Sequence, residues 1–413
     1  MEGAAKAKNL FFLSAVESFW GFGMNLVSMG TVLPVFLAEQ GASNGVIALI
    51  PALSALGMGL PQVLSGLVAG RGGTLRGWVI GIHLAIPLPL AATAALLRWS
   101  NLPPVPLVLA AWGLFYALIG VVIPLWFEYM ARILDPARRG RAFGIVFFLQ
   151  TALGASGLAA AAALLEGGTG LGTYALLFAL AWAATTAGGL FFLGTREERP
   201  SEAPRASGLV GHLKSLAGLL RRTGWMAAFL PCRWLVRGCY PLLLHFYAVF
   251  AVVHRGASPA EAALFGAAGL VGQAFAGVAA GLLGDRLGHK LPTLLGQAGL
   301  VVACFLVLLP LPTWIFYAVA VLTGVFLSTE YTSQVNWVMD LSALEDRPGI
   351  LALTGFLMTP PAVLAPLAGG WVMDRAGFPA VSAAVGLILL VAMLAELLLV
   401  PSRLGAKPSS LRR

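Results

Sequence analysis

Charged residues are scarce in this sequence. Only 10% of its 413 residues are charged, whereas 59% are hydrophobic. A soluble globular domain usually carries about 25% charged residues, and its surface-to-volume ratio limits how many apolar side chains it can bury. The composition therefore excludes an ordinary soluble protein and predicts an integral membrane protein, whose lipid-facing side chains are apolar as well.

Motifs of several enzyme and metal-binding classes are also missing. The three cysteines lack the spacing of a zinc or thioredoxin site, so we expect free thiols and no metal. The sequence has no Walker-type phosphate loop and no His-Glu-x-x-His. These absences argue against ATP as the energy source and against an enzyme, and they predict a protein without a cofactor.

The formal net charge of +9 does not indicate a nucleic-acid partner. The basic residues are spread over short loops between apolar segments, and no basic stripe with interleaved aromatic side chains is present. We therefore expect a lipid bilayer as the environment, no nucleic acid as a partner, and a monomer.

Twelve apolar segments are long enough to cross a bilayer. They are too long for strands and lack period-two alternation, so the predicted fold class is an all-α membrane protein with twelve transmembrane helices. The first six segments cover residues 9–38, 45–69, 77–97, 104–134, 142–165 and 173–194. The second six cover residues 224–253, 260–284, 291–310, 313–341, 349–373 and 380–400. The predicted domains are a first six-helix bundle at residues 1–194, a cytoplasmic linker at 195–223, a second six-helix bundle at 224–400 and a cytoplasmic tail at 401–413.

Lysine and arginine are distributed unevenly between the two sides of the predicted spans. An even number of spans puts both termini on one side, and that side holds most of the 26 basic residues. Only Arg98, Arg255 and Arg375 fall in segments on the other side, while Arg233 and Arg237 fall inside a span. Because cytoplasmic loops are rich in lysine and arginine, we predict cytoplasmic termini and a location in the cell inner membrane.

The two halves of the chain repeat at a shift of 215 residues. Residues 41–43, Gly-Ala-Ser, match residues 256–258, and residues 66–73 share glycine, leucine and arginine positions with residues 281–288. Agreement of two separate loops at one shift indicates an internal duplication. Parallel repeats of six helices imply two bundles related by an axis along the membrane normal.

The loop residues resemble those of the major facilitator superfamily. Residues 281–290, Gly-Leu-Leu-Gly-Asp-Arg-Leu-Gly-His-Lys, look like the superfamily signature between the second and third helices of a half. The first-half copy has Gly70 in place of the acidic residue, and residues 135–141 are similar to the loop after the fourth helix. The resemblance implies two pseudo-symmetric bundles, alternating access and a small-molecule substrate.

The same resemblance implies gating roles for these loops. Asp285 would cap a neighbouring helix N-terminus and latch the cytoplasmic side in the outward-open state. Alternatively, the basic residues of the loop only anchor a tight turn at the cytoplasmic face. Glu128 and Arg132 form an i, i+4 pair that is structural or belongs to the gate. The candidate gating residues are Gly281, Asp285, Arg286, Gly288, Arg71, Glu128, Arg132, Arg139 and Arg141.

Glu17 is an ionisable residue inside the first span. Ser14, Gly21 and Asn25 share its helical face, which gives an otherwise apolar helix one polar stripe. Ionisable groups in a bilayer are costly, with a central cost of about 2.5–3.5 kcal/mol, and they usually face protein or water. We expect Glu17 to take up a proton or form an ion pair, although its nearness to the cytoplasmic end also allows simple hydration.

Arg233 and Arg237 lie one turn apart in the seventh span. At the 215 shift Arg233 falls next to the counterpart of Glu17, so we hypothesise a Glu17–Arg233 pair between the halves. An arginine at low dielectric also suits a carboxylate or phosphate through bidentate hydrogen bonds. Alternatively, both arginines only neutralise carboxylates of the protein. The candidate substrate-binding residues are Asn25, Arg233, Arg237, Tyr240, His245, Gln334 and Trp337.

Glu330 in the tenth span is the second candidate for proton coupling. Burial would favour the neutral form of Glu330, whereas a nearby arginine would favour the charged form, and a proton-coupling carboxylate requires this balance. A static ion pair is the alternative, because it would have the same sequence pattern. Glu396 in the twelfth span has no partner within its own helix. We predict that it is protonated or that it snorkels towards the interface.

These features predict a secondary transporter that moves a small organic anion and is coupled to protons. A multidrug efflux antiporter is the alternative within transport, although residues 145–165 lack the Gly-Pro pattern of the drug/proton antiporter branches. The alternative from another class is a non-transporting sensor or lipid-handling membrane protein.

Overall fold

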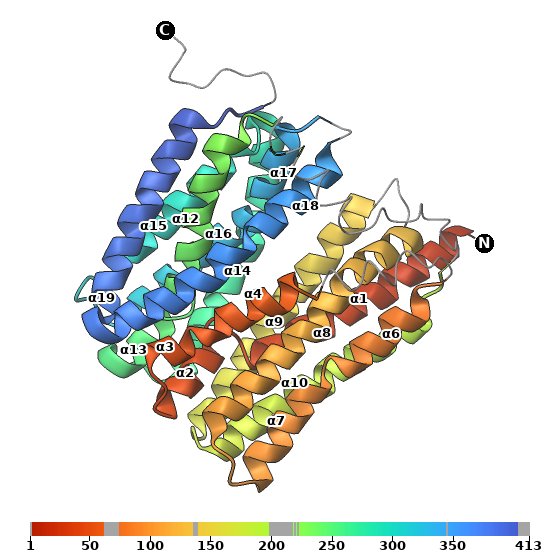
Figure 1. Cartoon of the computed structure of the whole chain (residues 1–413). Helices are drawn as coiled ribbons and strands as arrows, with labels where there is room; N and C mark the ends of the chain where they lie inside the picture. Colours follow the sequence, from red (N-terminus) through yellow and green to blue (C-terminus); the bar gives the residue numbers. More distant parts are fainter. Residues whose placement is uncertain are drawn as a thin grey trace. The chain divides into compact units, whose positions relative to one another are not determined.

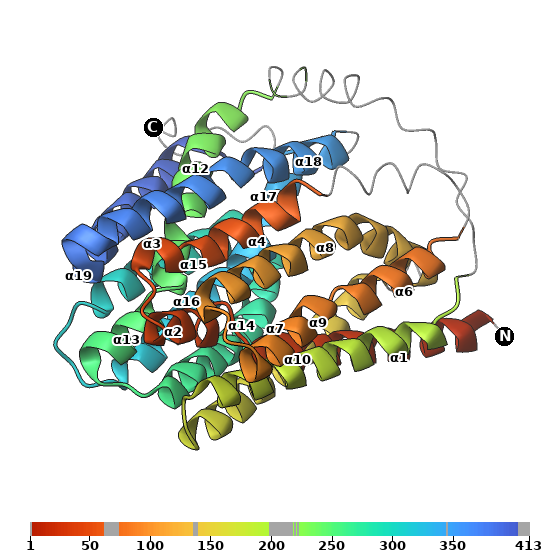
Figure 2. The same cartoon turned by 60° about the horizontal axis from the view of Figure 1, so that its bottom comes forward.

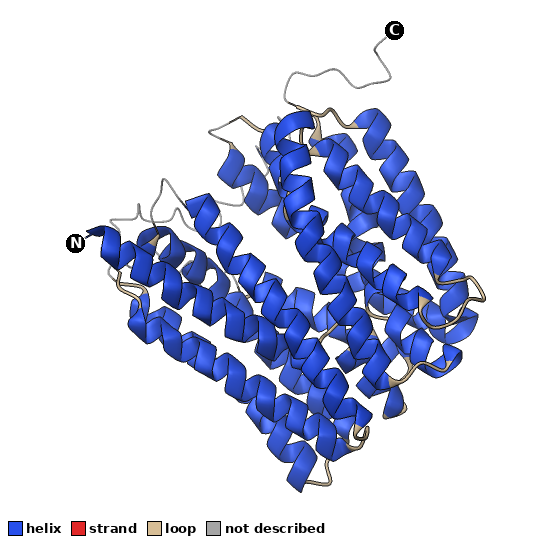
Figure 3. Ribbon diagram, turned by 180° about the vertical axis from the view of Figure 1, so that it is seen from behind, coloured by secondary structure: helices blue, strands red, loops and turns tan. Residues whose placement is uncertain are grey.

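The computed structural model describes residues 2–61, 74–134, 139–197, 218, 220, 223–343 and 346–403. All regular secondary structure in these ranges is helical, and they contain no strand (Figure 3). The predicted all-α class is therefore confirmed for the described residues. This outcome follows from the apolar composition, because a helix satisfies its own backbone hydrogen bonds in a bilayer.

The helices follow one another in the order drawn in Figure 1. Before the predicted linker they are α1 (Glu2–Leu26), α2 (Val32–Glu39), α3 (Asn44–Ile47), α4 (Leu49–Gly59), α6 (Arg76–Ala85), α7 (Leu88–Trp99), α8 (Pro104–Ile133), α9 (Arg139–Glu166), α10 (Leu171–Phe191) and the 3₁₀ helix η1 (Phe192–Gly194). After it they are α12 (Met226–Leu244), α13 (Tyr247–Arg255), α14 (Pro259–Leu287), α15 (Lys290–Leu306), α16 (Ile315–Tyr331), α17 (Ser333–Asp340), α18 (Arg347–Leu357) and α19 (Thr359–Leu399).

Eight stretches of described helix are long and apolar enough to cross a membrane. Two shorter apolar helices cover Asn44–Gly59 and Lys290–Leu306. The last long stretch, Gly349–Leu399, bends at Gly377, whose φ of 79° lies in the left-handed region that glycine alone enters without strain. The chain is thus a multi-pass helical membrane protein, while the count of twelve spans and the cytoplasmic termini remain predictions.

Several predicted spans contain a break between two helices. The run 224–253 is divided between α12 and α13 at His245 and Phe246. Pro241 precedes this break and has no N–H to donate to the carbonyl of the previous turn, which weakens the helix there. The run 9–38 is divided in the same way between α1 and α2 near Thr31, whose φ is −137°.

The described chain forms two compact units. The first comprises Met1–Ala42, Leu53–Ala206 and Ser258–Ala267, and the second comprises Ser43–Ala52, Ser207–Ala257 and Ala268–Arg413. The two exchanged segments, Ser43–Ala52 and Ser258–Ala267, are separated by the 215-residue shift of the internal repeat. The predicted domain boundaries ignore this exchange, and most of the predicted linker lies outside the described residues.

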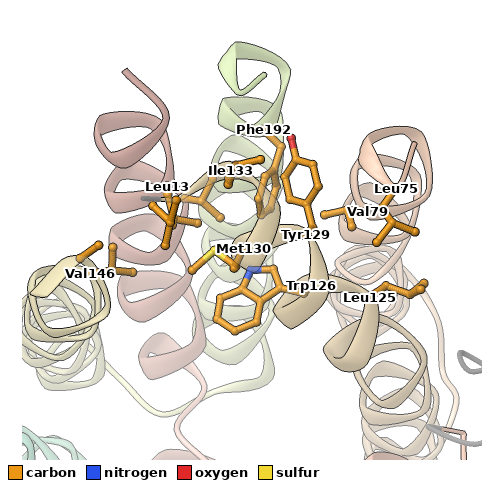
Figure 4. Close-up of a cluster of buried hydrophobic side chains, with 13 residues drawn as sticks. Leu13, Leu75, Val79, Leu125, Trp126, Tyr129, Met130, Ile133, Val146 and Phe192 are labelled. Atoms are coloured by element: carbon orange, nitrogen blue, oxygen red, sulfur yellow. The ribbon is translucent and has the colours of Figure 1, made fainter. Parts of the chain in front are cut away.

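The first unit is held by an aromatic and aliphatic core (Figure 4). Trp126, Tyr129 and Met130 of α8 gather beside Phe192 of η1 in this view, with Leu13 of α1 to their left. Helices α1 and α9 also approach closely, because Gly21 of α1 lies against the backbone of Gln150 and Gly157 of α9 lies against the backbone of Phe22. This close approach brings the polar side chain of Gln150 next to the polar stripe of α1.

The second unit has its own core. Phe229 and Trp337 pack edge to face at 5.5 Å, and Met226, Leu341 and Ile350 are buried around them. Helices α14 and α16 approach through glycine as well, because a Cβ on Gly324 would meet the backbone oxygen of Gly269. These two helices therefore pack at a short interhelical distance.

Candidate functional site

Arg233 is the centre of a buried charge cluster in the second unit. It is 1% exposed, and its guanidinium contacts two carboxylates that come from different helices. Its Nη2 donates to Glu330 Oε2 of α16, and its Nη1 donates to Glu396 Oε1 of α19 at 3.3 Å. The helices that carry the cluster, α12, α16 and α19, can be followed in Figure 2. Glu330 is therefore ion-paired, as the sequence allowed.

The prediction that Glu396 snorkels towards the interface is wrong. Its side chain is 0% exposed and pairs with Arg233. Helical spacing within α19 could not reveal this partner, because Arg233 precedes it by 163 residues. Glu396 Oε2 and both polar atoms of the buried Gln297 side chain have no hydrogen-bond partner in the described part of the chain.

Arg237 lies one turn beyond Arg233 and has different surroundings. Its Nη1 donates to the Tyr240 hydroxyl at 2.9 Å, and its guanidinium lies 5.5 Å from the centre of the Tyr240 ring. Its Nε is buried and lacks a hydrogen-bond partner among the described residues. Tyr331, whose hydroxyl lies 3.5 Å from that of Tyr240, is 55% exposed. No described carboxylate forms a salt bridge with Arg237, so its charge is held mainly by neutral phenol groups.

Glu17 is buried in the first unit, with 7% of its surface exposed. Gln150 Nε2 of α9 donates to Glu17 Oε2 at 2.7 Å, and no cation of the described part of the first unit forms a salt bridge with it. Asn25 donates to the Gly21 carbonyl oxygen of its own helix at 2.8 Å. The hypothesised Glu17–Arg233 pair would join the two units and remains a prediction.

The other candidate substrate-binding residues differ in how deeply they are buried. His245 is 1% exposed at the end of α12, and Gln334 is half-buried on α17. Trp337 is 0% exposed in the core of the second unit, where its indole N–H donates to the Pro401 carbonyl oxygen at 3.0 Å. A tryptophan enclosed in this way does not fit a substrate contact, so we assign it a packing role.

Glu197 joins three elements of the first unit. Arg132 Nη1 donates to it at 2.7 Å, and the backbone N–H groups of Leu75 and Arg76 each donate to it at 2.9 Å. Its carboxylate thus caps the start of α6 and interacts favourably with the positive end of the helix dipole. Glu128 also pairs with Arg132 at 3.0 Å, but its side chain is 44% exposed. Sequence analysis found the Glu128–Arg132 pair and missed Glu197.

The predicted gating loops are described only in part. Gly281, Asp285 and Arg286 are exposed, and Gly288 has the left-handed φ of 86° that a tight turn requires. Arg71 lies outside the described residues. The backbone of Arg139 and Arg141 belongs to α9, but their side chains lie outside the description. The latch proposed for Asp285 remains a prediction.

Asp374 of α19 forms a second carboxylate cap that the sequence did not reveal. It accepts hydrogen bonds from the backbone N–H groups of Asn44 at 2.7 Å and Gly45 at 3.0 Å. Ser43 caps the same turn through its side chain, which accepts from the Val46 N–H at 3.3 Å. The cap fixes the start of α3 against α19 within the second unit.

The arrangement combines buried charges with an incompletely bonded guanidinium. Arginine with free N–H groups binds carboxylates and phosphates, and buried carboxylates can exchange protons. No group of three ligating side chains suited to a metal occurs among the described residues.

Comparisons with known proteins bear on the fold. The family model of the Major Facilitator Superfamily matches residues 240–413. Among curated protein sequences, none matches the chain. Solved structures resemble it in fold over almost its whole length, and the family model agrees with the resemblance stated from the loop residues over the matched part of the chain.

Three of these structures illustrate the likeness. A mutant of the nucleoside transporter NupG has a TM-score of 0.76 at 13% identity and covers 94% of this chain and 98% of its own. A D-xylose–proton symporter has a TM-score of 0.70 at 16% identity, with 95% and 98% covered. A bacterial homologue of the human lysosomal transporter Spinster, in an inward-facing conformation, has a TM-score of 0.69 at 15% identity, with 95% and 97% covered. At these identities the likeness establishes the fold.

Proposed function

We propose that this chain belongs to the major facilitator superfamily and is a secondary transporter of a small organic anion. Transport would proceed by alternating access of two six-helix bundles. We further propose cytoplasmic termini, a location in the cell inner membrane and a monomeric state. The fold supports transport, and the charges within the helices support the solute class.

The observation that carries the anion proposal is the state of Arg237. Arg233 is occupied by two carboxylates, whereas Arg237 contacts phenol groups and has a buried Nε without a partner among the described residues. A buried N–H left without an acceptor costs about 1–3 kcal/mol. A carboxylate or phosphate of the solute would accept from this Nε and balance the charge, while the Tyr331 hydroxyl lies nearby to orient it.

Two buried carboxylates support coupling to protons. Glu17 receives one hydrogen bond from the neutral Gln150 side chain, and Glu330 pairs with Arg233. A carboxyl group in either position changes the local charge balance when it gains or loses a proton. One of the similar folds is a D-xylose–proton symporter, which adds support from the fold level.

A thermal-shift screen of the purified protein tests the anion site. Organic anions, sugars, peptides and cationic drugs would be compared, because a bound ligand raises the apparent stability. We expect anions to stabilise the wild-type protein and Arg237→Lys, which keeps the charge. We expect Arg237→Gln to bind about 10- to 100-fold more weakly, since a charge-assisted hydrogen bond contributes about 1.5–3 kcal/mol. Stabilisation by cationic drugs alone would favour multidrug efflux and contradict the proposal.

A flux assay separates transport from the alternative class. Proteoliposomes would be loaded with the stabilising solute and assayed for exchange against external labelled solute. A transporter exchanges solute across the membrane, whereas a sensor or lipid-handling protein binds without soluble-solute flux. Binding without exchange would therefore overturn the transport part of the proposal and leave the anion site standing.

A further inference from the structure

Four charged residues of the second unit lie on three helices, and Arg233 is at their centre. Arg233 and Arg237 belong to α12, Glu330 belongs to α16 and Glu396 belongs to α19. The two positive and two negative charges balance when every group is ionised. Arg233 can neutralise only one of the two carboxylates. The charge of the other carboxylate is balanced only while the positive charge of Arg237 is not neutralised by another anion.

We propose that Glu396 is the proton-binding residue of the second unit, and that its protonation is linked to occupation of Arg237 by an anion. This inference rests on the proposed function for the identity of the anion. It predicts that anion and proton bind together, so that they cross the membrane in the same direction.

The physical reason is the cost of unbalanced charge in a dry site. An anion on Arg237 neutralises that guanidinium and leaves Arg233 facing two carboxylates. A buried net charge is strongly unfavourable, and a bound proton removes it. By linkage, a proton already bound to the cluster favours the anion to the same extent.

The geometry selects Glu396 over Glu330 as the proton carrier. Each carboxylate accepts one hydrogen bond from Arg233, Glu330 from Nη2 and Glu396 from Nη1 at 3.3 Å, so their remaining oxygen atoms distinguish them. Glu396 Oε2 and both polar atoms of the Gln297 side chain on α15 form no hydrogen bond of standard geometry among the described residues, although Gln297 lies close enough to interact with the Glu396 carboxylate. A proton on Glu396 Oε2 would create a donor, and Gln297 Oε1 is an unused acceptor for it.

Other ionisable groups around the cluster are held in different ways. On α12, Cys232 adjoins Arg233 in sequence, and the Tyr240 hydroxyl accepts from Arg237. Tyr331 of α16 lies beside Tyr240. Lys290 of α15 donates to the carbonyl oxygens of Leu397 and Val400, so its charge is held at the end of α19. None of these contacts supplies the missing partner of Glu396 Oε2.

The test is an infrared pH titration of the purified, ligand-free protein, read at the carbonyl stretch of protonated carboxylic acids. The variants are Arg237→Gln, which mimics the neutralised guanidinium, Arg237→Lys, which keeps the charge, and Glu396→Gln. We expect the band of one carboxylic acid to titrate at higher pH in Arg237→Gln than in the wild-type protein. Arg237→Lys should titrate as the wild type does, and Glu396→Gln should lose the band.

An unchanged titration in Arg237→Gln would overturn the inference. So would the absence of a titrating carboxylic-acid band from the difference spectrum between the wild-type protein and Glu396→Gln, in which the band of Glu17 cancels. If Glu396→Gln does not fold, Gln297→Leu replaces it, because removal of the acceptor should shift the frequency of the Glu396 band without abolishing it. The measurement needs no solute. A positive titration together with a negative anion screen would therefore reject the proposed solute and retain the proton site, and the opposite pattern would reject only the proton site.

Discussion

Asp374 and Asn44 lie 330 residues apart in the sequence, yet the carboxylate of the first accepts a 2.7 Å hydrogen bond from the backbone N–H of the second. The repeat explains why this cap is needed. In the second copy, Ser258 and Glu261 form a reciprocal capping box at the start of α14. The first copy has Val46 at the position of Glu261, and Asp374 supplies the missing carboxylate from another helix.

This relationship predicts a local effect of Asp374→Ala. The amide hydrogens of Asn44 and Gly45 lose their acceptor, and we expect them to exchange about 5- to 10-fold faster, since a helix cap contributes about 1 kcal/mol. Hydrogen exchange with fragment-level mass spectrometry measures this change. The start of α14, with its own capping box, serves as the internal control and should exchange at the wild-type rate. Equal exchange of both segments in the variant and the wild type would refute the role of Asp374.

Glu17 provides the second prediction. A glutamine at this position resembles a permanently protonated carboxyl group, so Glu17→Gln should uncouple transport from the proton gradient. We expect exchange of labelled solute across proteoliposomes to persist, while accumulation driven by a pH gradient falls by about tenfold or more. The carboxyl of Glu166, which is exposed at the end of α9, provides the matched control, because Glu166→Gln should preserve both activities. Normal accumulation in Glu17→Gln would show that this residue does not carry the coupled proton.

The close approach of α1 and α9 predicts different costs for two glycines of one helix. A Cβ on Gly157 would collide with the Phe22 backbone, whereas Gly144 faces open space. We expect Gly157→Ala to destabilise the protein by about 1–3 kcal/mol through overpacking. Gly144→Ala should be neutral or slightly stabilising, because alanine favours the helix. Thermal unfolding in detergent compares the two variants, and equal midpoints would contradict the packing described.

Two acidic partners of Arg132 should also differ in their contribution to stability. Glu197 is buried and caps α6, so Glu197→Gln should cost about 1–3 kcal/mol. Glu128→Gln should change stability by less than about 1 kcal/mol, because exposed ion pairs contribute little. The same thermal measurement tests both variants, and a larger loss for Glu128→Gln would contradict the assignment.

The parts of the fold that depend on local pattern were predictable from the sequence. Apolar runs indicated the helices, and the 215-residue shift relates the two exchanged segments, Ser43–Ala52 and Ser258–Ala267, to each other, but the exchange itself was not predicted. Helix breaks were harder to predict, since the kink at Gly377 and the break after Pro241 depend on single residues within long apolar runs.

The candidate site was predictable only where its residues share a helix. Arg233 and Arg237 were identified because charge within a span is rare, but their different partners depend on α16 and α19. Glu396 was misjudged for the same reason, since its partner lies on another helix. For Trp337, the face shared with Gln334 could not reveal that the indole is enclosed in the core.

The most direct test of the central proposal is anion-driven proton movement in proteoliposomes that contain a pH-sensitive dye. An inward gradient of the stabilising organic anion is imposed without any initial pH difference. We predict acidification of the vesicle interior with the wild-type protein and with Arg237→Lys. The rate of acidification should fall at least about tenfold with Arg237→Gln. Anion entry without acidification, or the same acidification in Arg237→Gln, would contradict it.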